Sequence, residues 1–174
     1  MMSNAAARGA RDKLLQMASP FRMLLFALQR AQHVFNRLWR PLTIGVRAIV
    51  IDAENRVFLV RHSYLPGWHL PGGGVEPGET VRAALERELA EEGNIELTGE
   101  PSLLCVYFNN YASERDHVLI YIVRDFRQTA PRERDWEIVE TGFFPADALP
   151  EQSARATRAR IAEALEGGRT ADIW

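Results

Sequence analysis

The chain has 174 residues, of which 47% are apolar and 25% charged, and its formal net charge is −2. These are the values of an average soluble globular protein, and they exclude collagen, low-complexity chains and multi-span membrane proteins. The one cysteine, Cys105, cannot form an intrachain disulfide. That excludes a disulfide scaffold and favours a reducing, cytoplasmic location.

The charge is distributed unevenly along the chain. The first 40 residues carry seven basic side chains and one acidic one, whereas the rest of the chain carries 14 basic and 22 acidic ones. A surface that is acidic over most of its length does not suit duplex nucleic acid as a partner. It suits a metal site better, because a divalent cation offsets the charge of clustered carboxylates.

Residues 1–40 are predicted to form a basic amphipathic helical extension, with Pro20 at a first helical position and Pro41 as the stop. Its longest apolar run, Met23–Leu28, is too short to span a bilayer. Three interpretations stay open. The helix packs on its own domain or on a second copy in a homodimer, residues 20–39 contact an anionic membrane surface, or the segment is an organelle-targeting leader.

Residues 41–174 have the pattern of one α/β domain. The first two predicted strands flank the turn Asp52–Asn55 and are expected to form a hairpin. Strands and helices that do not strictly alternate indicate a mixed sheet with helices packed on it. Strands are expected over 43–52, 56–62, 103–111, 116–126 and 137–144, and helices over 80–92 and 153–166.

Three glutamates in the first of these helices carry the strongest indication of chemistry. Glu88, Glu91 and Glu92 are spaced i, i+3 and i+4, so that their carboxylates converge on one patch. At about 100° per residue, the centre of the patch lies only about 70° from the apolar stripe of the helix. Unpaired carboxylates at the edge of a buried face are costly, and a hard divalent cation such as Mg²⁺ relieves that cost with oxygen ligands.

The loop before the helix is consistent with such a site. Gly72, Gly73 and Gly74 allow close backbone approach, and such a loop can offer carbonyls to a metal or amides to a phosphate. Pro77 and Gly78 then suit the two central positions of a type II turn, which directs the chain back toward the helix.

Two charged residues complete the pattern. Glu79 follows the turn and lies beside the helix N-terminus, where a negative charge is favourable. Arg87 can pair with Glu91 one turn further on or reach back to Glu79. Either pairing would hold the acidic patch in place.

The order and spacing of these residues closely resemble the signature of the Nudix (MutT-like) hydrolases. The match runs from Gly73 through Glu79 and the run Arg87–Glu92 to Ile95. Six specified positions at fixed spacing would coincide by chance in roughly one window in 10⁷, at about 6% usage per residue type. One position departs from the pattern, because Asn94 stands where glycine is expected. Asparagine is the next-best residue at a left-handed helix end.

The resemblance implies an α/β/α sandwich with a mixed central sheet over 41–174. It also implies hydrolysis of a diphosphate linkage in a nucleoside diphosphate bonded to another group, a nucleotide-type small molecule, with Mg²⁺ or Mn²⁺ as cofactor. Glu79 and Arg87 would orient the patch, and Glu88 or a glutamate outside the signature would help to deprotonate the attacking water. The implied metal ligands are the carboxylates of Glu88, Glu91 and Glu92 and the carbonyl of Gly73.

Residues outside the signature are weaker candidates. Glu137, preferred to Glu140, is the candidate for a loop glutamate that acts as base or extra ligand, with an ordinary surface glutamate as the equal alternative. Trp68 could stack on a base, although a core tryptophan is favoured. The candidate substrate-binding residues are Arg61, Trp68, Gly72 and Gly74. Tyr64, Tyr111 and Arg115 could line the same pocket, and the sequence does not rank them.

The substrate and the class of function are less determined than the family resemblance. Markers of the family's subclasses are mostly absent, so nucleoside triphosphates, ADP-ribose-like compounds and RNA 5′ ends all stay open. The alternative function is a non-catalytic Nudix-fold sensor that binds a nucleotide and regulates a partner. The intact glutamate triplet counts against it, because a pure binder has little reason to keep these residues.

Overall fold

The structure is a computed structural model that describes residues 42–167 and 171–174. The expected helical extension over 1–40, with its membrane contact by residues 20–39, lies outside the described residues. Within the described ranges, no helix is long and apolar enough to cross a membrane.

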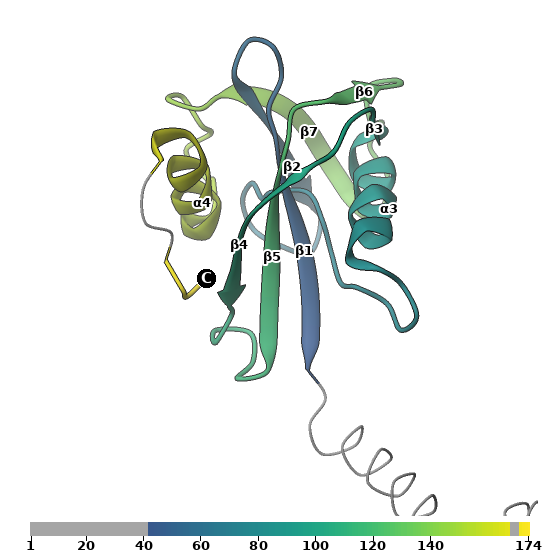
Figure 1. Cartoon of the computed structure of the whole chain (residues 1–174). Helices are drawn as coiled ribbons and strands as arrows, with labels where there is room; N and C mark the ends of the chain where they lie inside the picture. Colours follow the sequence, from purple (N-terminus) through teal and green to yellow (C-terminus); the bar gives the residue numbers. More distant parts are fainter. Residues whose placement is uncertain (1–41, 168–170) are drawn as a thin grey trace, which may run out of the picture. The chain divides into compact units, whose positions relative to one another are not determined.

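A mixed sheet forms the middle of the domain (Figure 1). Its central strand β5 (Asp116–Val123) pairs in parallel with β1 (Thr43–Val50) and antiparallel with β4 (Ser102–Phe108). The β-branched residues of β1 and β5 favour extended backbone. A strand buried from both sides reads as a nearly continuous apolar run, which is the pattern of Val46 to Ile51 apart from Arg47.

Two smaller strand pairs extend the fold. β2 (Arg56–His62) pairs antiparallel with β7 (Ile138–Pro145). The three-residue strands β3 (Ile95–Leu97) and β6 (Phe126–Gln128) pair antiparallel with each other. Neither short strand was expected, because three residues are too few to show a periodicity.

The predicted hairpin between residues 43–52 and 56–62 is wrong. The two segments reverse direction at the turn, but a single bridge, Ile51 with Val57, connects them. The strands then part, since β1 pairs with β5 and β2 with β7. The turn signal was local and correct, whereas the pairing partners come from distant parts of the chain.

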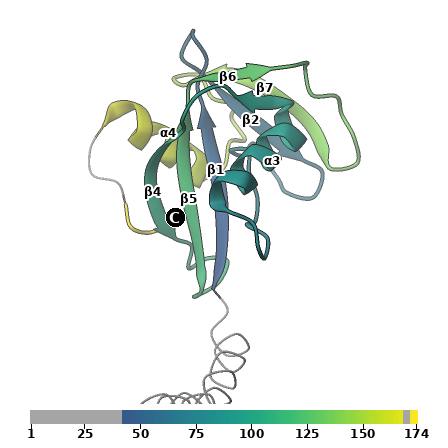
Figure 2. The same cartoon turned by 45° about the vertical axis from the view of Figure 1, so that its right-hand side comes forward.

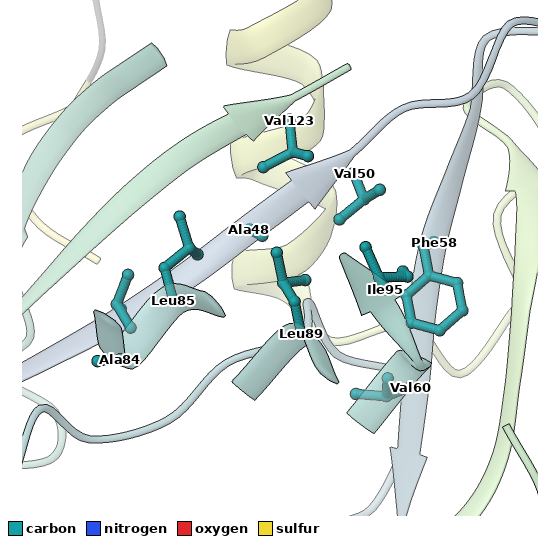
Figure 3. Close-up of a cluster of buried hydrophobic side chains, with 10 residues drawn as sticks. Ala48, Val50, Phe58, Val60, Ala84, Leu85, Leu89, Ile95 and Val123 are labelled. Carbon is teal, nitrogen blue, oxygen red and sulfur yellow. The ribbon is translucent and has the colours of Figure 1, made fainter. Parts of the chain in front are cut away.

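Helices α3 (Val81–Gly93) and α4 (Arg155–Glu166) cover opposite sides of the sheet, as Figures 1 and 2 show. On the α3 side, Ala84, Leu85 and Leu89 pack on residues of the strands (Figure 3). Full burial of a leucine contributes about 1.5–3 kcal/mol. The strand residues of this cluster are Val46, Ala48, Val50, Phe58, Val60, Ile95 and Val123.

A second apolar cluster fills the α4 side. Ile161 of α4 packs there with Trp68, Tyr107 and strand residues. These strand residues alternate along the chain with those that face α3. The alternation is visible along β2, where Val57 and Leu59 belong to the α4 side and Phe58 and Val60 to the α3 side. The layers are therefore helix, mixed sheet and helix, as expected for the sandwich.

Helix α3 is capped at both ends by its own sequence. The Thr80 side chain accepts the backbone N–H of the residue three positions on, at 3.1 Å. Asn94 ends the helix in the left-handed conformation, with φ of 52°. Gly93 is needed for packing, because a Cβ there would lie 2.9 Å from Ile95 Cδ1 and 3.0 Å from Phe58 Cε1. Gly93, one position before the glycine of the signature, is therefore explained by the lack of space for a side chain.

Candidate functional site

The glycine loop is attached along strand β1. The Val46 N–H donates to the Gly73 carbonyl at 2.8 Å, and a bridge joins Gly45 to Gly74. Gly72 has φ of +134°, and a Cβ there would lie 2.9 Å from Arg47 Cα. Only glycine therefore suits this position. The attachment brings the loop backbone against the helix that carries the glutamates.

Arg47 fixes the same loop from the strand side. Its Nη1 donates to the Leu70 carbonyl at 3.1 Å and also to the Gly72 carbonyl. Sequence reasoning missed this residue, although an arginine in an otherwise apolar strand is a signal that could have identified it. Its charge also acts on the neighbouring carboxylate of Glu92, described next.

Glu92 is the most buried of the three helix glutamates, with 9% of its side chain exposed. It accepts the Gly72 N–H at 2.7 Å, and its other oxygen lies 3.4 Å from His62 Nε2. Burial raises the pKa of Glu92 to about 7, and the charges of Glu88 and Glu137 act in the same direction. The Gly72 hydrogen bond and Arg47 lower it in part. Such a carboxylate is stabilised by any cation that approaches it.

Glu88 lies directly beneath the loop. Its side chain is 13% exposed, and a Cβ on Gly73 would lie 2.6 Å from Glu88 Cδ. The absence of a side chain at Gly73 therefore makes the space that the Glu88 carboxylate occupies. Glu91, by contrast, is 61% exposed. The expectation that all three carboxylates lie at the edge of the buried face is right for Glu88 and Glu92 and wrong for Glu91.

Arg87 joins the loop, the turn and the helix. Its Nε donates to Glu79 at 3.0 Å, and its Nη1 reaches Glu88 at 2.8 Å and Glu91 at 3.3 Å. Its Nη2 donates to the Gly74 carbonyl at 3.1 Å. The hydrogen bond from Arg87 lowers the pKa of Glu79. Both sequence-predicted pairings of Arg87 are present together.

The turn that carries Glu79 has the predicted form. The Glu79 N–H donates to the Glu76 carbonyl at 3.0 Å, and Gly78 has φ of +87°. The Glu79 side chain in turn accepts the Glu76 N–H at 3.0 Å. A type II turn requires this positive φ at its third residue.

The donor atoms fit a hard divalent cation. Glu88, Glu91 and Glu92 offer carboxylate oxygens, and the Gly73 carbonyl keeps a second lone pair beside the one that accepts the Val46 N–H. In the part of the chain that the structure describes, no three His, Cys, Asp or Glu side chains are already grouped closely enough to hold a metal ion. Arg87 bridges the carboxylates instead.

A second group of polar residues lies at the ends of β2 and β7. Tyr64 Oη donates to Glu137 Oε1 at 3.2 Å, and the Tyr64 ring lies 5.1 Å from the ring of His62. Burial lowers the pKa of the His62 imidazole, and Arg47 lowers it further. Its Nδ1 is buried and has no hydrogen-bond partner among the described residues. Glu137 lies close enough for its charge to act on both Glu92 and His62.

The domain that carries these residues matches a known protein family. The family model described as NUDIX domain matches residues 41–165. The chain belongs to the Nudix family. Nudix hydrolases generally use divalent metal ions, in agreement with the oxygen-rich donor set of this domain.

Two solved structures illustrate the likeness of this Nudix domain to known folds. The MutT NUDIX hydrolase from Burkholderia pseudomallei is 29% identical with a TM-score of 0.60, over 70% of this chain and 96% of that chain. A UDP-X diphosphatase is 22% identical with a TM-score of 0.61, over 86% of this chain and 80% of that chain. The predicted α/β fold with a mixed sheet is thus confirmed as a Nudix fold.

Curated relatives match over shorter stretches. The 8-oxo-dGDP phosphatase NUDT18 of Homo sapiens is 29% identical over 117 residues, which are 66% of this chain and 36% of that protein. An RNA pyrophosphohydrolase of Legionella pneumophila is 38% identical over 71 residues, which are 38% of this chain and 39% of that protein. The matches span less than half of the length of these curated relatives.

The remaining candidates of the Nudix domain are placed as follows. Trp68 is 8% exposed and packs edge-on against Phe144 at 4.8 Å, which is the core position that the sequence favoured. Arg61 pairs with Glu140 at 2.6 Å, and its guanidinium lies 5.7 Å from the Trp68 ring. Glu140 is therefore engaged with Arg61, while the charge of Glu137 acts on Glu92.

Proposed function

We propose that this chain hydrolyses a diphosphate linkage in a nucleotide-type substrate, with Mg²⁺ or Mn²⁺ as its cofactor. The observation that carries the proposal is the contact of the glycine loop with Glu88 and Glu92, where Gly73 makes room for one carboxylate and the Gly72 N–H binds the other. A structural loop would not need two glycines to bring carboxylates to its backbone.

In this proposal, Glu88, Glu91, Glu92 and the Gly73 carbonyl hold the cation. A divalent cation held there would supply positive charge to offset that of the diphosphate and would lower the pKa of a water bound to it. The exposed Glu91 carboxylate is the one that has to turn toward the patch, a rotation that its surface position permits.

The other residues orient the carboxylates or accept a proton. Arg87 fixes the Glu88 carboxylate while Glu79 neutralises the guanidinium on its other side. Glu88 or Glu137 accepts the proton of the attacking water. Glu137 suits this role because Tyr64 orients one of its oxygens by a hydrogen bond. Gly72 and Gly74 line the loop against which the phosphates would lie, and Arg61 and Trp68 support the wall behind it.

The class of substrate is supported by the names of the relatives. The 8-oxo-dGDP phosphatase, the RNA pyrophosphohydrolase and the UDP-X diphosphatase all act, by these names, on compounds that join a phosphate chain to a nucleoside. We further place the activity in the cytoplasm, on the basis of the single cysteine, Cys105.

The test is a hydrolysis assay over a panel of nucleotides with Mg²⁺. The wild-type chain is expected to release phosphate-containing products, and Glu91→Gln to lose about a hundredfold or more in rate, since a cation ligand would be lost. Glu86→Gln is the matched control, because Glu86 lies on the same helix and pairs with Arg82 away from the loop. It removes the same charge and is expected to leave the rate unchanged.

Two results would contradict the proposal. Equal turnover of wild type and Glu91→Gln would refute the assignment of the glutamate roles. Nucleotide binding without any hydrolysis by the wild type would favour the alternative function, a Nudix-fold sensor that binds a nucleotide without cleaving it.

A further inference from the structure

Two large aromatic side chains at the edge of the candidate site are exposed to solvent. Trp136 is 81% exposed and Tyr64 is 61% exposed. Trp136 directly precedes Glu137 in the chain, and Tyr64 is hydrogen bonded to the Glu137 carboxylate. Trp68, a few residues after Tyr64 in the chain, is only 8% exposed and lies in the core. Exposed apolar surface of this size at a functional site indicates contact with a partner or ligand.

The backbone beneath Trp136 is fixed although its ring is exposed. Ser63 Oγ donates to the Trp136 carbonyl at 2.8 Å. On either side, Asp135 Oδ1 accepts the N–H groups of Glu137 at 2.8 Å and Ile138 at 2.7 Å. With this backbone held, only the two side-chain torsions of Trp136 have to be ordered on binding, which suits a recognition residue.

A chain of hydrogen bonds joins this backbone to the helix with the acidic patch. Arg132 Nε donates to the carbonyl of Glu91 at 2.7 Å, and the Arg132 guanidinium also pairs with Asp135. Asp135 then holds Glu137, as described above. The position of Trp136 is therefore coupled through these residues to the glutamates that we propose as cation ligands.

The ring of Tyr64 is held on the other side of Glu137. Its Oη is directed to the carboxylate, and its ring packs near His62, which is 5% exposed. The exposed part of Tyr64 is consequently the surface that faces away from the core. Both aromatic surfaces thus lie at the Glu137 end of the site and are open to a ligand.

We propose that Trp136 and Tyr64 form a stacking surface for the nucleobase of the substrate. This inference rests on the proposed function, because it requires that a substrate with its phosphates at the glycine loop extends its nucleoside past Glu137, whose charge acts on Glu92 of the patch. Aromatic faces bind bases of every type, and one stacked base contributes about 1–3 kcal/mol to binding. The surface therefore supplies affinity for the nucleoside half of the substrate, while the acidic patch acts on the phosphate half.

The test compares ligands that carry a base with one that does not. Binding of GDP and of inorganic pyrophosphate to the full chain is measured by isothermal titration calorimetry with Mg²⁺ present. Trp136→Ala is expected to weaken GDP binding about tenfold and to leave pyrophosphate binding unchanged. Trp136→Phe and Tyr64→Phe keep an aromatic face and are expected to bind GDP nearly as the wild type does.

The matched control is Leu103→Ala. Leu103 is a large apolar residue of β4 that is 50% exposed and belongs to none of the candidate site residues. A tenfold loss in Trp136→Ala but not in Leu103→Ala would support a specific stacking surface. Equal GDP affinity of Trp136→Ala and the wild type would overturn it, as would a change in oligomeric state in Trp136→Ala without a change in GDP affinity, because the surface would then be a contact between copies.

The same variants separate this inference from the proposed function. If the wild type hydrolyses nucleotides and Trp136→Ala has an unchanged KM, the enzyme function stands and the stacking surface is wrong. If GDP binding depends on Trp136 and no nucleotide is hydrolysed, the stacking surface stands and the proposed hydrolysis fails. The result expected when both are right is a raised KM with little change in kcat.

Discussion

At the scale of single residues, neighbouring glycines of the loop have different physical reasons. Gly72 has a positive φ and contacts the backbone of β1. Gly73 has no conformational requirement of that kind, but the Glu88 carboxylate fills the space where its side chain would be. A Cβ on Gly74 would meet no atom within 4 Å beyond its chain neighbours. Of the three neighbouring glycines, one is required by its backbone conformation, one by the lack of space for a side chain, and one by neither.

This difference predicts opposite results for two adjacent substitutions. Gly73→Ala is expected to displace the Glu88 carboxylate and to lower the hydrolysis rate by about tenfold to a hundredfold, with a small change in stability. Gly74→Ala leaves the Glu88 carboxylate in place, so it is expected to lower the rate much less than Gly73→Ala does. Hydrolysis rates with titrated Mg²⁺ measure the effect, together with urea unfolding of both variants. Similar rates for both variants would show that the Glu88 position does not matter.

At the scale of elements, the segment after β6 completes the end of α3. Gln128 Nε2 donates to the Gly93 carbonyl at 2.9 Å, and Asn94 Nδ2 reaches the Pro131 carbonyl at 3.3 Å. Arg132 adds its bond to the carbonyl of Glu91. The last carbonyls of a helix have no partners inside it, so the bonds from Gln128 and Arg132 satisfy two of them from outside. Asn94 is therefore both the left-handed cap and an anchor for the next segment, a second use that glycine could not provide.

Removal of the Arg132 side chain is predicted to loosen this connection. Arg132→Ala is expected to cost about 1–2 kcal/mol of unfolding free energy and to speed amide exchange at Glu137 and Ile138, whose N–H groups are bound to Asp135. Its hydrolysis rate should fall as well. Hydrogen exchange followed by mass spectrometry or NMR measures the local effect.

Arg127→Ala is the control for that experiment. Arg127 lies on β6, is 68% exposed and pairs with the exposed Glu96. An exposed pair contributes little to stability, so exchange at Glu137 should match the wild type. Equal exchange in Arg132→Ala and Arg127→Ala would show that Arg132 does not connect the two elements.

At the scale of the whole molecule, the described residues supply an apolar cluster on each side of the sheet. Among these residues, the cluster on the α3 side begins at Val46 and the cluster on the α4 side begins at Ile49. The match to the family also starts at residue 41. The core of this domain is therefore expected to form without residues 1–40.

A chain that starts at Pro41 is accordingly predicted to unfold cooperatively and to keep the nucleotide hydrolysis of the full chain. Circular dichroism during urea unfolding and the hydrolysis assay check this expectation. Loss of cooperative unfolding would show that the extension packs on the domain. Co-sedimentation of both chains with anionic vesicles tests the membrane interpretation, and equal sedimentation of the two chains would exclude that interpretation. Light scattering measures the molecular size of both chains and so tests the homodimer.

Local signals predicted the elements that carry the site. The turn at Pro77-Gly78 and the left-handed end at Asn94 each depend on residues within a few positions of one another, and both are present. The hairpin prediction failed because β1 and β2 pair with β5 and β7, which come from distant parts of the chain. The periodicity of a segment shows that it forms a strand, but it does not show which distant strand it pairs with.

By itself, the sequence determined the glycine loop, the acidic helix and the resemblance to the Nudix hydrolases, because spacing along one helix and one turn is a local property. Only the tertiary structure decided that Glu92 is buried against His62 while Glu91 stays exposed, and that Glu140 is paired with Arg61. Those outcomes depend on how β2, β7 and the loop after β6 meet α3. Burial and charge at a site are sums over residues that only the folded chain brings together.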